Sequence, residues 1–177
     1  MDAVARNVCL LSRLRHVCIS EACNTFFHAH IMSRINYVSN VWDSCSDVHL
    51  KKLKAVHKRA VKVLCAASPM LTGRGHISYG PLPLKEHLQC NKCILVHKVI
   101  CNKSPQYLRQ LVHTGACNDH KKSILILPKT RTDIYKMSFA YSGSLCWNAL
   151  PRRLKIACSV STFKSEALQH FRTKCNI

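Results

Sequence analysis

The stretch from Asp47 to Ala66 reads DVHLKKLKAVHKRAVKVLCA and has the clearest periodicity in the chain. At about 100° per residue, its apolar positions fall on one side of a helix and its cations on the other. The apolar side holds Leu50, Leu53, Val56, His57, Ala60, Val61, Val63 and Leu64, and the cationic side holds Lys51, Lys52, Lys54, Lys58, Arg59 and Lys62. The stretch predicts a helix from Val48 to about Ala66, capped by Asp47, with one packed face and a cationic ridge about 16 Å long.

Further helical patterns lie between the scarce glycines (5) and prolines (6) of the chain. The stretch from about Leu84 to Asn102 has apolar residues almost all the way round, so we expect this helix at the centre of the core. Four further helices are expected, at Ser20–Ile35, Ser104–Leu111, Phe139–Leu150 and Ser161–Phe171. Ser20, Ser104 and Ser161 are the expected N-caps of three of them.

One short segment has a different pattern. Ile124-Leu125-Ile126-Leu127 lies between Ser123 and Pro128 and is typical of a strand or an extended segment. The fold class is therefore predicted to be mainly α, an irregular helical bundle of about five to seven helices with at most a short extended segment near 123–128. We expect residues 1–177 to form a single, mainly helical domain, with any subdivision near the loop at 68–80.

The charge balance is the unusual feature of the composition. The 177 residues include 27 Lys and Arg against 8 Asp and Glu, which gives a formal net charge of +19. A solvated surface does not require such an excess, so the balance favours a polyanionic partner: nucleic acid or an anionic membrane.

A membrane partner is the weaker of these two interpretations. No stretch reaches the roughly 18 apolar residues of a membrane span, and the ridge helix lacks Trp or Phe to insert into a bilayer. The first residues do not resemble a signal peptide, so we expect the protein in the nucleus or cytoplasm and not secreted. The 12 cysteines are then expected to be reduced and mostly to behave as small apolar core residues.

A zinc site is suggested by the spacing of Cys90, Cys93, His97 and Cys101, which is close to that of a zinc knuckle. However, the segment is strongly helical, and a straight helix advances about 16 Å over this span. Four ligands so far apart do not meet at one tetrahedral centre. The favoured interpretation is a sulfur-lined helix face in the core, and no metal or other cofactor is predicted.

Catalysis is poorly supported by the acidic residues. They are scattered along the chain, and only Asp43 and Asp47 lie close together, across the start of a predicted helix. Polymerases and nucleases need convergent carboxylates to hold magnesium. There is also no nucleophile elbow, phosphate-binding loop or dinucleotide fingerprint. We therefore predict that this chain is not an enzyme.

The cations are better suited to phosphate binding than to base readout. They form the ridge and three smaller clusters, which include Lys121-Lys122. The candidate nucleic-acid-binding residues are Lys51, Lys54, Lys58, Arg59, Lys62, Lys129, Arg131, Arg152, Arg153 and Lys155. For any single lysine, a solvated surface position remains the alternative.

Three sets of motifs, taken in order, resemble the carboxy-terminal region of LINE-type (non-LTR) retrotransposon reverse transcriptases. The first set is Ile35-Asn36-Tyr37, Val41-Trp42, Leu50-x-x-Leu53 and Lys58-Arg59-Ala60-Val61-Lys62; the second is Leu82-Pro83-Leu84-Lys85-Glu86, His97-Lys98-Val99 and Ser104-Pro105-Gln106-Tyr107-Leu108. The third and most specific set is Leu127-Pro128-Lys129-Thr130-Arg131-Thr132, Ser138-Phe139, Leu145-Cys146-Trp147-Asn148-Ala149-Leu150-Pro151 and Ser161-Thr162-Phe163-Lys164. The resemblance covers roughly residues 14 to 171.

The resemblance implies a transposable-element origin and a place beyond the polymerase palm. In this family of RNA-directed DNA polymerases, the catalytic aspartates lie upstream of such a segment, and the thumb and its continuation hold template RNA and target DNA. The chain departs from the family at His57, where Gln is common, and at Val38, where Gly is usual. Ser142 stands where a basic residue is common.

These observations lead to two function hypotheses and leave a third open. The first is a noncatalytic, basic, nucleic-acid-binding fragment derived from a retrotransposon reverse transcriptase, whose partners are the RNA or DNA phosphate backbone and the parental reverse transcriptase. The second is a protein-interaction module, or a nonfunctional relic, that docks on an acidic partner. A zinc-dependent binding domain is the third. The tryptophans Trp42 and Trp147 are assigned to packing, with Asn148 bonding backbone near the break at Pro151.

Overall fold

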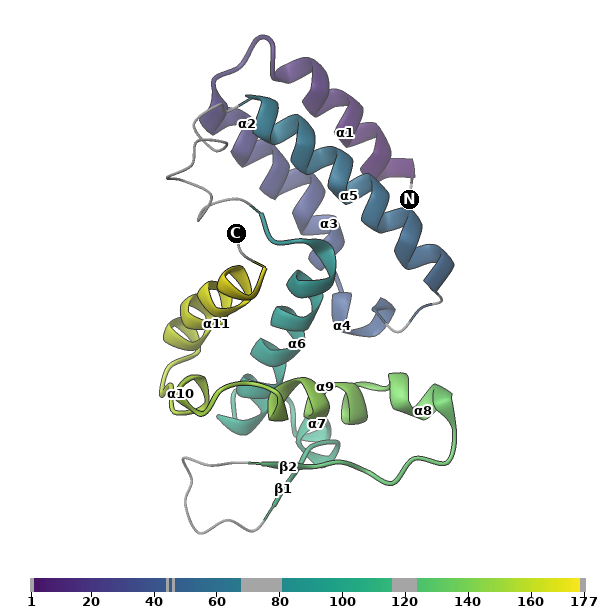
Figure 1. Ribbon diagram of the computed structural model, residues 1–177, viewed down its shortest axis with the longest axis vertical. Coiled ribbons are helices and arrows are strands. Elements are labelled where there is room, and N and C mark those ends of the chain that lie inside the picture. The colour runs from purple at the N-terminus through teal and green to yellow at the C-terminus, as the bar shows by residue number, and fades with distance from the viewer. Residues whose placement is uncertain (1, 44, 46, 68–80, 116–123, 176–177) are drawn as a thin grey trace. The chain divides into compact units, whose positions relative to one another are not determined.

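The computed structural model describes residues 2–43, 45, 47–67, 81–115 and 124–175 (Figure 1). These residues are mainly helical, which confirms the predicted fold class. They form two compact units, Met1–Lys85 and Glu86–Cys175. The loop near 68–80 lies outside the described residues, so a single domain divided there stays a prediction.

The first unit consists of helices connected by short turns. In chain order they are α1 (Asp2–Leu14), α2 (Ser20–Phe26), the π-helix η1 (Phe27–Met32), α3 (Ser33–Asn36), α4 (Ser39–Trp42) and α5 (Asp47–Ala67). The segments α2, η1 and α3 follow one another without a break, as predicted for this stretch. Helix α4 begins after Val38, which has a positive φ of 50° and turns the chain.

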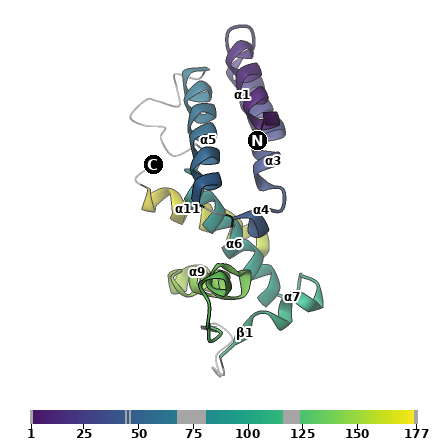
Figure 2. The ribbon, with the colours of Figure 1, turned by 90° about the vertical axis from the view of Figure 1, so that its right-hand side faces the viewer.

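The core of this unit lies where α1, α5 and the α2–η1–α3 run meet. α1 packs on η1 and α5, and α2 also packs on α5; α1 and α5 lie side by side (Figure 2). The buried apolar side chains are Val4, Val8 and Leu11 of α1, Cys23, Phe27, Ile31, Met32 and Ile35 of the middle run, and Ala60 and Leu64 of α5.

The second unit is built around α6 (Leu84–Ile100), which corresponds to the predicted central helix. It is followed by α7 (Gln106–Gln110), β1 (His113–Thr114), β2 (Leu125–Ile126), α8 (Asp133–Met137), α9 (Phe139–Asn148), α10 (Arg152–Lys155) and α11 (Val160–Lys174). β2 confirms the predicted extended segment, and it pairs antiparallel with β1 in the register His113↔Ile126 and Thr114↔Leu125.

Three rings form the centre of the second unit. His97 of α6 stacks on Phe163 of α11, with ring centroids 4.3 Å apart and planes inclined by 6°. Trp147 of α9, which is 1% exposed, lies 5.7 Å from Phe163 and 6.1 Å from His97. The packing role predicted for Trp147 is therefore confirmed.

Helix α9 approaches α6 closely at Gly143. A Cβ atom there would lie 3.2 Å from the side chain of Val96 and 3.1 Å from that of Phe139. A larger residue would have to displace one of these side chains, so the small residue sets the separation of the two helices.

The predicted N-caps differ from those in the structure. Ile19 precedes α2 and Pro105 precedes α7, so neither Ser20 nor Ser104 is a cap. The cap of α11 is Ser159 and not Ser161, because its hydroxyl accepts a hydrogen bond from the backbone N–H of Ser161 at 3.3 Å.

Among the described residues, five helices have ten or more residues, namely α1, α5, α6, α9 and α11.

Candidate nucleic-acid interface

Helix α5 carries its cations on one side. Lys51, Lys52, Lys54, Lys58, Arg59 and Lys62 are all exposed. On the opposite side His57, Ala60 and Leu64 are buried, and Leu50, Leu53 and Val56 are half-buried. The structure therefore brings together the five α5 residues of the candidate site, Lys51, Lys54, Lys58, Arg59 and Lys62, on an exposed surface that we call the α5 cationic face.

The inner side of α5 includes one titratable group, His57, which is 3% exposed. Its ring lies 6.4 Å from that of Phe27, and Nε2 is buried with no hydrogen-bond partner among the described residues. Burial lowers the pKa of the His57 imidazole, because the charged form loses its hydration. The positive charge of α5 is thus concentrated on its outer side.

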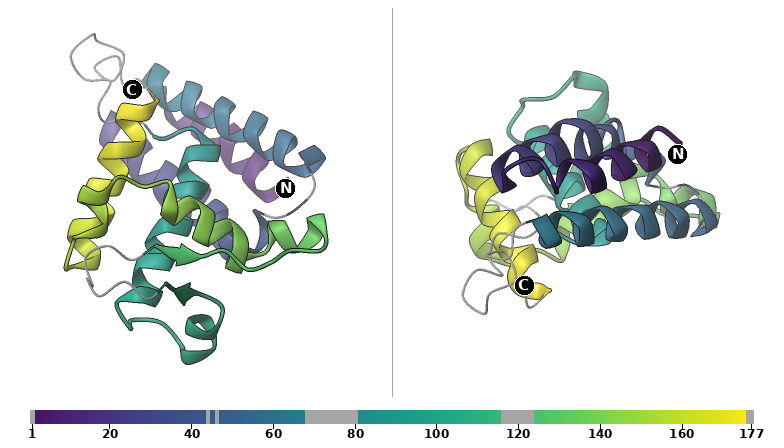
Figure 3. Two further views of the ribbon diagram at one scale, coloured as in Figure 1. Left: turned by 60° about the horizontal axis from the view of Figure 1, so that its bottom comes forward. Right: turned by 90° about the horizontal axis from the view of Figure 1, so that it is seen from above.

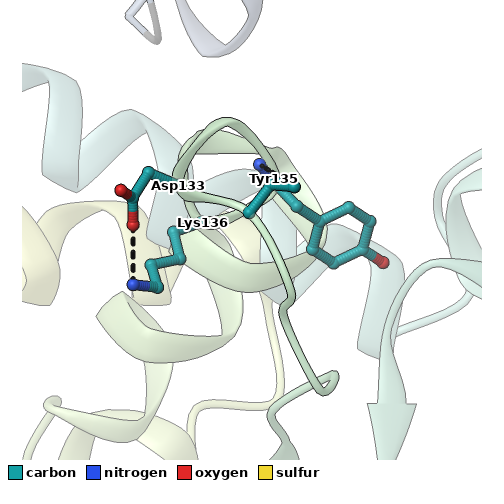
Figure 4. A network of polar contacts seen from close by, with 4 residues as sticks. Asp133, Tyr135 and Lys136 are labelled. Atoms are coloured by element: carbon teal, nitrogen blue, oxygen red, sulfur yellow. Dashed lines mark hydrogen bonds and ion pairs between the residues drawn. The ribbon is translucent and has the colours of Figure 1, made fainter.

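The α5 cationic face is not neutralised by neighbouring acids. In the part of the chain that the structure describes, none of its lysines and arginines takes part in an ion pair. An example of a neutralised lysine is found in α8, where the Nζ of Lys136 lies 2.8 Å from a carboxylate oxygen of Asp133 (Figure 4). This bond lowers the pKa of Asp133 and raises that of Lys136.

The candidate residues of the second unit lie at two places. Lys129 and Arg131 are exposed in the segment between β2 and α8, whereas Arg152 and Arg153 are exposed on α10. The first place precedes α8 in the chain, and the second follows α9, a helix about 15 Å long (Figure 3). Lys121-Lys122 lies outside the described residues.

Lys155 differs from the other candidate residues because it is half-buried. Its Nζ donates a hydrogen bond to the carbonyl of Asn148 at 3.2 Å and lies 6.0 Å from the centroid of the Trp147 ring. Burial and the nearby Arg152 lower its pKa. Lys155 therefore binds the last carbonyl group of α9, and little of its charge is available to a ligand.

The side-chain amide of Asn148 binds the backbone of β2 and not the backbone near Pro151, so the predicted partner was wrong. Its Oδ1 accepts a hydrogen bond from the Leu125 N–H at 3.0 Å, and its Nδ2 donates to the Leu125 carbonyl at 2.9 Å. The amide satisfies both backbone groups of a strand residue 23 positions away. A contact so distant in sequence leaves no local pattern by which it could be predicted.

The four residues with zinc-knuckle spacing do not surround a common metal position. Cys90 and Cys93 are buried, and burial raises the pKa of both thiols, to about 12 for Cys90, which disfavours the thiolate that zinc binds. His97 Nε2 lies 3.0 Å from the carbonyl oxygen of Ala157, and Cys101 Sγ lies 3.6 Å from the same nitrogen. Among the described side chains, no three potential ligands cluster around one point.

Three comparisons with known proteins bear on the wider classification. No family model matches the chain, and no curated protein or solved structure matches it significantly. Among the described residues, no helix has both the length and the hydropathy needed to cross a bilayer.

Proposed function

We propose that this chain is a noncatalytic nucleic-acid-binding fragment of a LINE-type retrotransposon reverse transcriptase, and that the α5 cationic face is its principal phosphate-contacting surface. The observation that supports this most directly is the exposure of six α5 cations on a helix whose other side is packed. Packing fixes the helix orientation, so the cations are presented together along about 16 Å.

The chemistry of this face favours backbone binding without base readout. Lysine ammonium groups act as mobile point charges, and phosphates on duplex DNA are spaced at about 1.7 Å of helix axis per charge. A ridge of this length can therefore neutralise several phosphates at once. Such contacts position a nucleic acid but carry no sequence information.

The proposal extends to origin and location. The motif order supports derivation from a reverse transcriptase, with the parental enzyme as a further partner and the nucleus or cytoplasm as the site of action. The scarcity of acids, 8 in 177 residues, supports a noncatalytic role. The alternative is a protein-interaction module or nonfunctional relic that docks on an acidic partner.

The test is the salt dependence of binding to a labelled duplex DNA and to an RNA of the same length. For phosphate contacts, log K should fall linearly with log salt, with a slope of roughly −0.9 per contact on duplex DNA. Replacing Lys51, Lys54, Lys58 and Lys62 together with Ala should flatten this slope by up to about 3.6, four contacts' worth.

A matched control removes the same charge elsewhere. Replacement of Lys85, Lys98, Lys103 and Lys164 with Ala also removes four exposed lysines, but none of them belongs to the α5 cationic face. This variant should keep most of the wild-type slope. Absence of binding at low salt would refute nucleic-acid binding, and equal slopes for the two quadruple variants would refute the role of α5.

A further inference from the structure

Helices α1 and α5, which lie side by side (Figures 1 and 2), line a groove of about 460 Å³. Its described lining comes from these two helices alone: Ala5, Arg6, Val8, Cys9, Leu10, Arg13, Val56 and Arg59. The volume is within the usual range of ligand-binding clefts, about 300–1,000 Å³.

Three of the residues that line this groove are arginines. Arg6 and Arg13 are seven positions apart on α1, so they lie on one side of that helix, and Arg59 faces them from α5. All three are exposed, and none forms an ion pair with a described residue. The lining of the groove therefore offers guanidinium groups from both helices to an occupant.

The apolar residues of the lining have a different chemistry. Ala5, Val8, Leu10 and Val56 supply apolar surface, and Leu10 remains 45% exposed. An exposed leucine between arginines is suited to an occupant that carries an apolar stripe with acids beside it. An amphipathic helix with this pattern is a common occupant of grooves between helices.

Nucleic acid is less well matched to this groove than to the outer side of α5. Phosphate groups gain nothing from the apolar surface of Val8, Leu10 and Val56, which a nucleic-acid backbone would cover without a matching contact. A second copy of this chain is also disfavoured, because each copy carries a net charge of +19.

We propose that the α1–α5 groove binds an acidic amphipathic helix of a protein partner, with the helix's apolar side chains on Leu10 and Val56 and its carboxylates paired with Arg6, Arg13 and Arg59. This interaction is separate from phosphate binding by the lysines of α5 and does not depend on it. Only Arg59 belongs to both surfaces.

The experiment measures binding of the full chain to a labelled peptide of about 18 leucine and glutamate residues, with leucines spaced three and four apart. The control peptide has glutamine in place of every glutamate. We expect the acidic peptide to bind at least about tenfold more tightly than the control peptide. The double replacement Arg6→Glu and Arg13→Glu should lower the affinity for the acidic peptide by at least about tenfold.

Two further variants give the experiment its controls. Arg34→Glu with Lys98→Glu changes the net charge equally at exposed positions outside the groove and should leave peptide affinity within about twofold. Leu10→Ser should lower the affinity for both peptides, because it removes apolar surface from the lining of the groove. Circular dichroism establishes that each variant keeps its helices.

The outcomes distinguish this proposal from nucleic-acid binding. Failure of the acidic peptide to bind, equal binding of both peptides, or an unaffected Arg6→Glu/Arg13→Glu variant would each overturn the groove proposal. So would a loss of duplex DNA affinity in that variant larger than in the Arg34→Glu/Lys98→Glu control, since the groove would then hold phosphates. Each of these results leaves the α5 lysine test unchanged.

Discussion

Helices α5 and α10 both carry closely spaced cations, but they present them differently. On α5 every lysine and arginine is exposed, because the helix is long enough to pack on one side and keep its charges on the other. On α10, a four-residue helix, Arg152 and Arg153 are exposed while Lys155 folds over Trp147 and bonds the end of α9. A high density of lysine therefore indicates a binding surface only where the local packing leaves the ammonium groups in solvent.

The largest effect is expected from the ring cluster on which Lys155 lies. Trp147→Ala removes a side chain that is 1% exposed and should lower the free energy of unfolding by about 3–5 kcal/mol. Chemical denaturation followed by circular dichroism measures this change. Trp42→Ala is the matched control. Because Trp42 is only half-buried, this substitution should lower the free energy of unfolding by less. An unchanged midpoint for Trp147→Ala would contradict the packing role.

The attachment of β2 to α9 should be the next most sensitive contact. Asn148→Ala removes the two hydrogen bonds to the backbone of Leu125 and leaves both groups unsatisfied, at a cost of about 1–3 kcal/mol. Hydrogen exchange of the Leu125 amide should also become faster. Asn24→Ala, at an exposed position of α2, controls for the loss of an asparagine. Equal stability of the two variants would show that the Asn148 bridge is dispensable.

Three helices show how much of the fold could be predicted from the sequence. Helices α5 and α6 have long patterns with a clear period, or apolar residues all round, so their place and character were predicted correctly. Helix α1 was missed, although Val4, Val8 and Leu11 are correctly spaced for one buried face.

The candidate site was predictable to a similar degree. The exposed side of α5 followed from its periodicity alone. The engagement of Lys155 was not predictable, because it depends on Trp147 and on the last carbonyls of α9, which only the fold brings near it. Arg6 and Arg13 had a detectable pattern, a spacing of seven residues, but it acquires meaning only beside Arg59 of α5.

The inner side of α5 should make the stability of the first unit depend on pH. Because burial lowers the folded-state pKa of His57 below its ordinary value of 6.5, the unfolded chain takes up the proton first. Stability is therefore full above about pH 6.5 and decreases below it, by at most about 1.4 kcal/mol per pH unit.

His57→Leu should reduce this loss of stability at low pH, as measured by denaturation between pH 7 and 5. The pKa of His170 in the second unit is also lowered, first by burial and then by Lys174 and Arg153, so part of the pH dependence should remain. His49→Leu makes the same change at an exposed position of α5. An unaltered pH profile in His57→Leu would contradict the neutral, buried state of this ring.

The smallest effect sharpens the comparison between α5 and α10. Lys155→Ala should destabilise the second unit by about 1 kcal/mol, through loss of the bond to Asn148 and of the contact with Trp147. It should leave the salt dependence of nucleic-acid binding within error of the wild type. Arg152→Ala, three positions earlier and exposed, should give the reverse result. A flatter salt slope for Lys155→Ala would show that its charge is available after all.

The most direct test compares the two cationic regions in one measurement, the slope of log K against log salt for duplex DNA. One variant replaces Lys51, Lys54, Lys58 and Lys62 with Ala, and the other replaces Lys129, Arg131, Arg152 and Arg153. If the α5 cationic face is the principal phosphate-contacting surface, the first variant loses up to about 3.6 in slope and the second clearly less. A wild-type slope in the α5 variant, or a larger loss in the other, would contradict that assignment.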